Sequence, residues 1–105
     1  MTFEVVIAPL AELELANFAA YAAEFSEDFA AEQFRRLNHV FSAVLAESPL
    51  TWGPFFVTGA PYHGYLFRAG RRTQFWIVYT VDEEKRRVNV LRFWNAGREP
   101  AAFEV

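Results

Sequence analysis

The chain has 105 residues, of which 53% are hydrophobic and 22% charged, and its formal net charge is −3 at pH 7. These values fit one globular domain, and the lack of cysteine excludes disulfides and thiolate metal sites. No basic segment followed by a long apolar run opens the chain, so we expect no signal peptide, no membrane span and a cytoplasmic location.

Charge is divided unevenly along the chain. Residues 1–50 contain eight acidic and two basic residues, a balance of −6, whereas residues 51–105 contain eight basic and five acidic residues, a balance of +3. The second half can therefore present a basic surface in a protein that is acidic overall. A normal mixture of solvated charges explains the same counts.

Residues 3–7 predict a first strand, which ends at Ala8-Pro9 because proline cannot donate to a β-ladder. Pro9 also suits the first turn of a helix, where its missing N–H is not needed. Alanine-rich sequence favours helix beyond it. Apolar residues at helical spacing mark this first helix: Leu15, Phe18, Ala22 and Phe25.

Ser26 interrupts the helical pattern and can cap a second helix, with the negative charges of Glu27 and Asp28 in its first turn. Pro49 marks the end of this helix, and the two helices form an antiparallel pair. One apolar stripe runs along it: Ala30, Phe34, Leu37, Phe41, Val44 and Leu45. Arg35, Arg36 and His39 fall largely outside the stripe, and we expect His39 on the surface.

Residues 48–61 read as a long loop, and three strands follow at residues 62–69, 75–81 and 87–94, separated by turns at 70–72 and 82–85. The order β-α-α-β-β-β predicts an α+β fold. A two-helix hairpin should pack on a mostly antiparallel four-stranded sheet, which the first strand must join because alone it has no partner.

This order and several segments of the sequence resemble the RelE/ParE family of bacterial toxins over nearly the whole chain. The segment VVIAPLAELELANFAAYAAE looks like the family's first strand and helix, and AAEQFRRLNHVFSAVLAESPL like its second helix. The best resemblance lies in GYLFRAGRRTQFWIVYTVDEEKRRVNVLRFWNAGREP. Within it, the matching positions are Val78-Tyr79-Thr80-Val81-Asp82, Leu91-Arg92 and Arg98-Glu99-Pro100.

Three departures from the family pattern concern activity. Trp76 stands where the family usually has an arginine, and Asn95 where it often has a histidine. The last five residues, 101–105, contain no tyrosine or histidine, one of which commonly assists catalysis in the ribonuclease branch.

The resemblance implies a single RelE/ParE-like toxin domain over residues 1–105, the toxin of a type II toxin–antitoxin system, which inhibits growth unless a cognate antitoxin neutralises it. We expect no cofactor and no metal, since two histidines without cysteine make a structural zinc site improbable. We expect Phe75, Trp76 and Trp94 to contact the antitoxin, with burial under the helices as the alternative for Trp94. A homodimer is left open.

Cleavage of RNA by its 2′-hydroxyl needs proton-transfer groups and cations that stabilise the phosphorane. Arginine suits the second role because it stays charged and holds phosphate through paired N–H groups. His63 is the one titratable candidate near the expected cations. With Arg98 it would form the catalytic pair of a ribonuclease. The residues expected to bind a target or its phosphates are Arg68, Arg71, Arg72, Arg92 and Arg98.

Each of these residues has a structural alternative. Arg71 and Arg72 fit a solvated turn, and Arg98 can fix the tail by bonding backbone carbonyls. Arg68 and Arg92 are expected on strands that lie near each other in the meander, but Arg92 can instead lie over the sheet and pair with an acid. His63 can be structural, and Tyr65 and Tyr79 can be core or partner contacts.

Two activities follow from the resemblance. We favour inhibition of DNA gyrase, as in the ParE branch, because it needs no catalytic residue and the tail NAGREP is nearer to that branch. The alternative is ribosome-dependent mRNA cleavage, as in the RelE branch. A third hypothesis is a detoxified module that keeps only a protein-binding surface.

Overall fold

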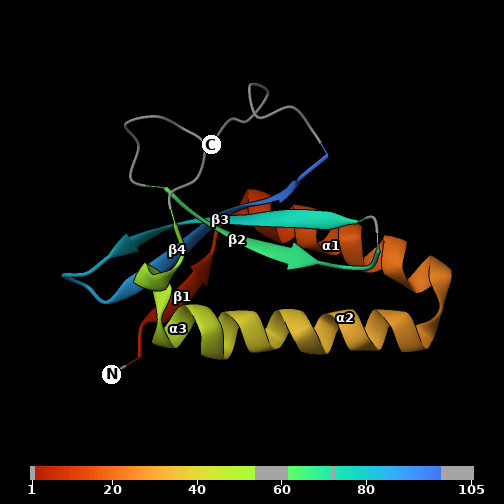
Figure 1. Ribbon diagram of the computed structural model, residues 1–105, viewed down its shortest axis with the longest axis horizontal. Helices are drawn as coiled ribbons and strands as arrows, with labels where there is room; N and C mark the ends of the chain where they lie inside the picture. The colour runs from red at the N-terminus through yellow and green to blue at the C-terminus, as the bar shows by residue number, and fades with distance from the viewer. Residues whose placement is uncertain (1, 54–61, 72, 98–105) are drawn as a thin grey trace.

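The computed structural model describes residues 2–53, 62–71 and 73–97. Its element order confirms the predicted α+β arrangement (Figure 1). The main elements are β1 (Glu4–Ile7), α1 (Pro9–Phe25), α2 (Glu27–His39), β2 (His63–Arg68), β3 (Gln74–Asp82) and β4 (Arg87–Asn95). After α2 come a π-helical stretch (Val40–Val44), the short α3 (Leu45–Glu47) and a 3₁₀ turn (Pro49–Thr51). No helix among the described residues is long and apolar enough to cross a bilayer.

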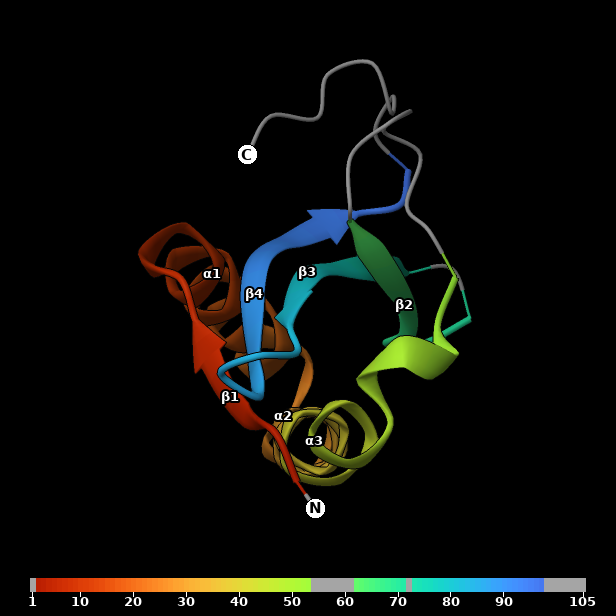
Figure 2. The same cartoon turned by 90° about the vertical axis from the view of Figure 1, so that its left-hand side faces the viewer.

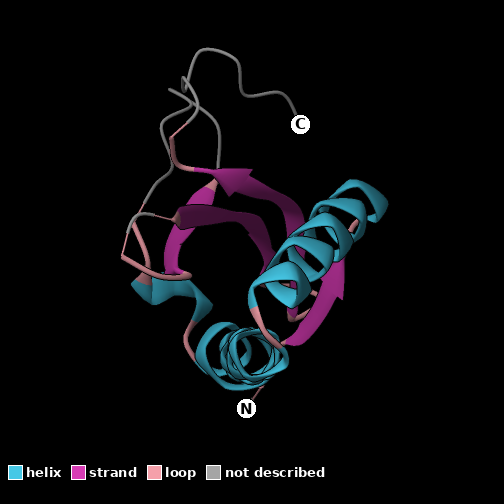
Figure 3. Ribbon diagram, turned by 90° about the vertical axis from the view of Figure 1, so that its right-hand side faces the viewer, coloured by secondary structure: helices cyan, strands magenta, loops and turns pink. Residues whose placement is uncertain are grey.

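The four strands form one sheet in the order β1-β4-β3-β2. β1 joins it at one edge, parallel to β4, whereas β4, β3 and β2 form an antiparallel meander. The sheet is therefore mostly antiparallel, as expected. Figures 2 and 3 show that it is curved, with α1 beside β1 and β4 and with α2 below it.

The predicted break between the two helices is present at Ser26. Its backbone is extended, and its side-chain oxygen accepts a hydrogen bond of 3.0 Å from the Phe29 N–H. This bond satisfies one of the free N–H groups at the start of α2. The chain therefore reverses without a loop, which places α1 and α2 side by side.

The second helix continues beyond His39 and ends before Pro49, as predicted, but its last part is irregular. Residues 40–44 are π-helical, a wider turn that the apolar spacing does not indicate. The Ala46 carbonyl beyond it accepts a hydrogen bond of 2.7 Å from the Phe3 N–H. The end of this helix is thus tied to the start of β1.

The main core lies between the helices and one face of the sheet. Ile77, Tyr79, Val88 and Val90 are fully buried there. Next to them the aromatic rings of Phe75 and Phe93 stack with centroids 4.3 Å apart, and Phe18 of α1 meets Phe75 edge-on at 5.0 Å. Aromatic pairs in such arrangements add to the stabilisation from buried area.

A β-bulge adjusts the pairing of β3 with β4. Val78 pairs with Arg92 and Tyr79 with Val90, so Leu91 is an extra residue on β4. Val90 and Phe93 are an odd number of positions apart, and strict alternation would place them on opposite faces. The bulge allows both side chains to enter the main core.

Beyond the short β1, the outer edge of β4 meets α1 instead of a strand. The Glu14 carboxylate accepts hydrogen bonds from the Phe93 N–H at 3.0 Å, from Arg92 Nε at 3.0 Å and from Arg92 Nη2 at 2.8 Å. Both side chains are largely buried, and the Arg92 guanidinium also lies 4.8 Å from the centre of the Trp94 ring. One carboxylate therefore supplies an acceptor to the strand edge and a counter-charge to a buried arginine.

We predict that Glu14→Ala destabilises the fold by about 3–5 kcal/mol, because it removes the carboxylate that pairs with the buried Arg92 guanidinium. Glu12→Ala is the matched control, since Glu12 lies on the same helix and is exposed, and it should change stability by less than about 0.5 kcal/mol. Urea unfolding followed by circular dichroism measures both variants. Equal stabilities of the two variants would contradict this role of Glu14.

Candidate functional site

His63 is held by two neighbours at the start of β2. Its Nδ1 lies 2.9 Å from the Trp52 carbonyl oxygen, to which it donates, and its ring stacks on Tyr79 with centroids 5.3 Å apart. This bond selects the tautomer that carries its proton on Nδ1. The half-buried imidazole thus fastens the segment before β2 to the sheet, in agreement with its structural alternative.

Tyr79 is fully buried, and its hydroxyl donates a hydrogen bond of 2.6 Å to the Pro49 carbonyl oxygen. Burial raises the pKa of this hydroxyl above its usual value of about 10. Tyr79 therefore stays protonated in the folded protein and acts as an anchor in the core.

The three predicted arginines that the structure describes, Arg68, Arg71 and Arg92, do not form one cationic site. Arg92 is buried and forms an ion pair with Glu14. This matches the structural alternative given for Arg92, and the side chain is not open to a phosphate. Arg68 and Arg92 lie on β2 and β4, two strands of the same meander with β3 between them. Arg68 and Arg71 are exposed. Arg72 and Arg98 lie outside the described residues. The predicted catalytic pair of His63 with Arg98 is therefore described only at His63.

The three predicted antitoxin contacts belong to two clusters. Phe75 packs in the main core, while Trp76 and Trp94 face each other across β3 and β4 in a second cluster with Val78. Trp94 is only 4% exposed, so little of its ring can meet a partner. Phe75 and Trp76 are half-buried and keep accessible surface.

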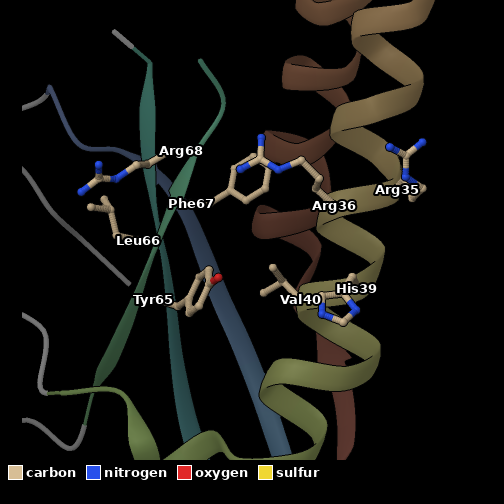
Figure 4. A pocket seen from close by; sticks show the side chains of 8 residues that line it. All are labelled: Arg35, Arg36, His39, Val40, Tyr65, Leu66, Phe67 and Arg68. Atoms are coloured by element: carbon tan, nitrogen blue, oxygen red, sulfur yellow. The ribbon is translucent and has the colours of Figure 1, made fainter. Parts of the chain in front are cut away.

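A cationic pocket lies between α2 and β2, with a volume of about 560 Å³. Figure 4 shows Arg36 extending from α2 toward Phe67, and Tyr65 directing its hydroxyl toward α2. Arg35 and Arg68 stand at the rims with their side chains turned outward. The full lining is Arg35, Arg36, His39, Val40, Tyr65, Leu66, Phe67 and Arg68.

Sequence reasoning did not assign this pocket. The signal on α2 was present, because Arg35, Arg36 and His39 fall outside the apolar stripe at spacings that share one helix surface. The sequence pattern does not indicate which strand forms the wall opposite α2. Only the strand order, with β2 at the open edge of the sheet, places Tyr65 across from α2.

An apolar groove of about 690 Å³ follows the line between α1 and α2. Phe34 stands on one side of it with 73% of its surface exposed, and Leu15 and Phe41 lie in it half-buried. Alanines of both helices form much of the remaining lining, namely Ala16, Ala19, Ala22, Ala30 and Ala31. Exposed apolar surface of this kind marks sites where a partner binds.

No group of three or more histidine, aspartate or glutamate side chains among the described residues is arranged to hold a metal ion. The titratable side chains that line the cationic pocket are His39 and Tyr65, beside Arg36. Such groups can bind an anion, and imidazole and phenol can also transfer protons.

No protein-family model and no curated protein matches the chain. Among solved structures, it is similar to a chain of the toxin–antitoxin complex RelBE2 from Mycobacterium tuberculosis, with a TM-score of 0.59 and 19% identity over 90% of this chain and 99% of that one. It also matches a chain of the archaeal RelE–RelB complex from Pyrococcus horikoshii OT3, with a TM-score of 0.45 and 14% identity over 94% and 100% of the two chains. The first similarity shows that the chain has this fold; the second is too distant to add to the argument.

We predict that Tyr79→Phe destabilises the protein by about 1–2 kcal/mol, because the buried Pro49 carbonyl loses its donor. Tyr21→Phe, at a 43% exposed position, is the control and should be nearly neutral. The pH dependence gives a second readout. Above about pH 10 the unfolded chain releases the Tyr79 proton and the folded protein does not, so the contribution of Tyr79 to stability declines as pH rises.

Unfolding in urea at pH 8 and pH 10.5 measures both effects. The loss of stability between these two pH values should be smaller in Tyr79→Phe than in the wild type. An equal loss in both proteins would show that the raised pKa of Tyr79 does not contribute.

Proposed function

We propose that residues 1–105 form the toxin of a type II toxin–antitoxin pair, acting in the cytoplasm. The observation that carries this proposal is the shared fold, which spans nearly the full length of a chain from the RelBE2 toxin–antitoxin complex. The order of sequence segments from VVIAPL to NAGREP independently supports the same family.

The apolar groove between α1 and α2 is the proposed seat of the antitoxin. A cognate antitoxin segment with apolar side chains would cover Phe34 and the alanines around it, and could extend to Phe75 and Trp76 at the sheet. A segment that orders on binding can cover a long surface of this kind. Expression without the antitoxin should therefore give a poorly soluble or self-associated protein.

For the target we propose DNA gyrase, inhibited by binding alone. Support comes from the engagement of His63, the predicted proton-transfer group, with Trp52 and Tyr79. Ribosome-dependent mRNA cleavage is the second candidate. It is favoured by His39 and Tyr65 beside Arg36, since these groups combine possible proton transfer with a cation.

Two assays on the purified protein separate these activities. We expect inhibition of gyrase supercoiling and no cuts in ribosome-bound mRNA by toeprinting, with Arg98→Ala weakening inhibition roughly tenfold to a hundredfold through loss of a charge-assisted contact. Codon-positioned cuts that disappear in His39→Gln or His63→Gln would instead establish a ribonuclease. Unimpaired growth of a bacterial host that expresses folded protein would favour the detoxified module.

The groove makes a separate prediction about the antitoxin. Phe34→Ser should weaken binding to the product of the neighbouring small reading frame about tenfold or more, because a large exposed ring is removed from the contact. Leu50→Ser is the control, since Leu50 is 52% exposed and does not line the groove. Calorimetric titration of the folded variants measures the affinities. Similar losses in both variants would place the antitoxin elsewhere.

A further inference from the structure

The cationic pocket stands out against the acidic first half of the chain, which supplies one of its walls. Residues 1–50 contain eight acidic residues and only two basic ones, and both of the basic residues, Arg35 and Arg36, line this pocket. His39 and Arg68 also line it, and no acidic residue does. Salt screens distant charges, so the groups at the pocket itself decide which ligand is attracted.

Arg36 is fixed in place by groups that leave its charge uncompensated. Its Nη1 donates a hydrogen bond of 2.8 Å to Oε1 of Gln33, a side chain that is only 5% exposed, and its guanidinium lies 4.8 Å from the centre of the Phe67 ring. An amide oxygen and an aromatic ring orient the guanidinium without neutralising it. Arg35, in contrast, is paired with Glu32 at the rim.

The two walls offer donors to one ligand. Arg36 and His39 stand on α2, and the Tyr65 hydroxyl faces them from β2 (Figure 4). The Tyr65 ring itself packs edge-on against the Trp52 ring, with centroids 4.7 Å apart. A tetrahedral anion can accept from both walls at once, whereas a planar carboxylate presents two oxygens in one plane.

We propose that this pocket binds a phosphate group, with Arg36 as the main contact and with His39 and Tyr65 as additional donors. The main contacts of this site come from α2, with Arg68 of β2 only at its rim, and the site does not depend on the target named above. The phosphate can belong to a small phosphate monoester or to the backbone of a single-stranded nucleic acid, two sources of the same chemistry.

The test is a titration followed by ¹H–¹⁵N NMR at constant ionic strength with three probes: inorganic phosphate, AMP and a short single-stranded RNA that has no terminal phosphate. We expect saturable shifts at residues 35–40 and 65–68. Tighter binding of AMP would identify a monoester as the source, and tighter binding of the RNA a backbone phosphate.

Three variants make the result specific. Arg36→Gln should weaken binding of the preferred probe about tenfold or more, and Arg36→Lys, which keeps the charge but not the planar fork, should recover only part of the affinity. His39→Gln, at an exposed position, tests the pocket without disturbing the core. Lys85→Gln removes one positive charge from the exposed β3–β4 turn and should have no effect.

The proposal is overturned if none of the three probes gives saturable shifts at these residues. Equal weakening by Lys85→Gln and Arg36→Gln would also overturn it, since this would indicate attraction to net charge. A pentaglutamate peptide that shifts the same residues at lower concentration than every phosphate probe would assign the pocket to an acidic protein segment instead.

Discussion

The arrangement of α1 against the sheet depends on the carboxylate of Glu14. β1 is too short to pair with all of β4, and the remaining edge needs acceptors for its N–H groups. Glu14 gives one to Phe93 and, with its other contacts, neutralises the buried Arg92. An apolar residue at position 14 could pack there, but the Phe93 N–H would lose its acceptor and Arg92 its carboxylate partner. The Glu14 side chain thus both positions α1 and satisfies part of the outer edge of β4.

This attachment determines which surfaces stay open. α1 is turned with Ala11, Phe18 and Ala22 toward the core, so its remaining apolar residues border grooves on either side. The Ser26 cap places α2 beside α1, and α3, which continues the second helix, is tied to the start of β1 through the Ala46 carbonyl. The basic surface of α2 therefore faces β2, the edge strand farthest from Glu14. The apolar groove and the cationic pocket lie on different sides of α2, so two ligands of different chemistry could occupy them together.

The elements were predictable because each has a local cause. β-branched and aromatic runs gave strands within one residue of their ends at β3 and β4, and Ser26 and Pro49 gave the limits of the second helix. The bulge at Leu91 was not predictable, since nothing in the alternation of β4 marks an extra residue. The role of Arg92 needed Glu14, which is 78 positions away, and only the fold brings the two together. The cationic pocket could not be predicted for the same reason, because its two walls come from distant segments of the chain.

An acidic protein can present a site for an anion because each charge acts only over a short distance. At physiological salt the field of a solvated charge fades within about 8 Å, so the net charge of −3 says little about any one surface. Glu27 and Asp28 lie in the first turn of α2, where they meet the positive end of the helix dipole, whereas Arg35, Arg36 and His39 lie toward its other end. This order stabilises the helix and also collects the positive groups of the first half of the chain beside β2. The same distribution of charge therefore favours both helix stability and anion attraction. A protein with a net negative charge can have this distribution.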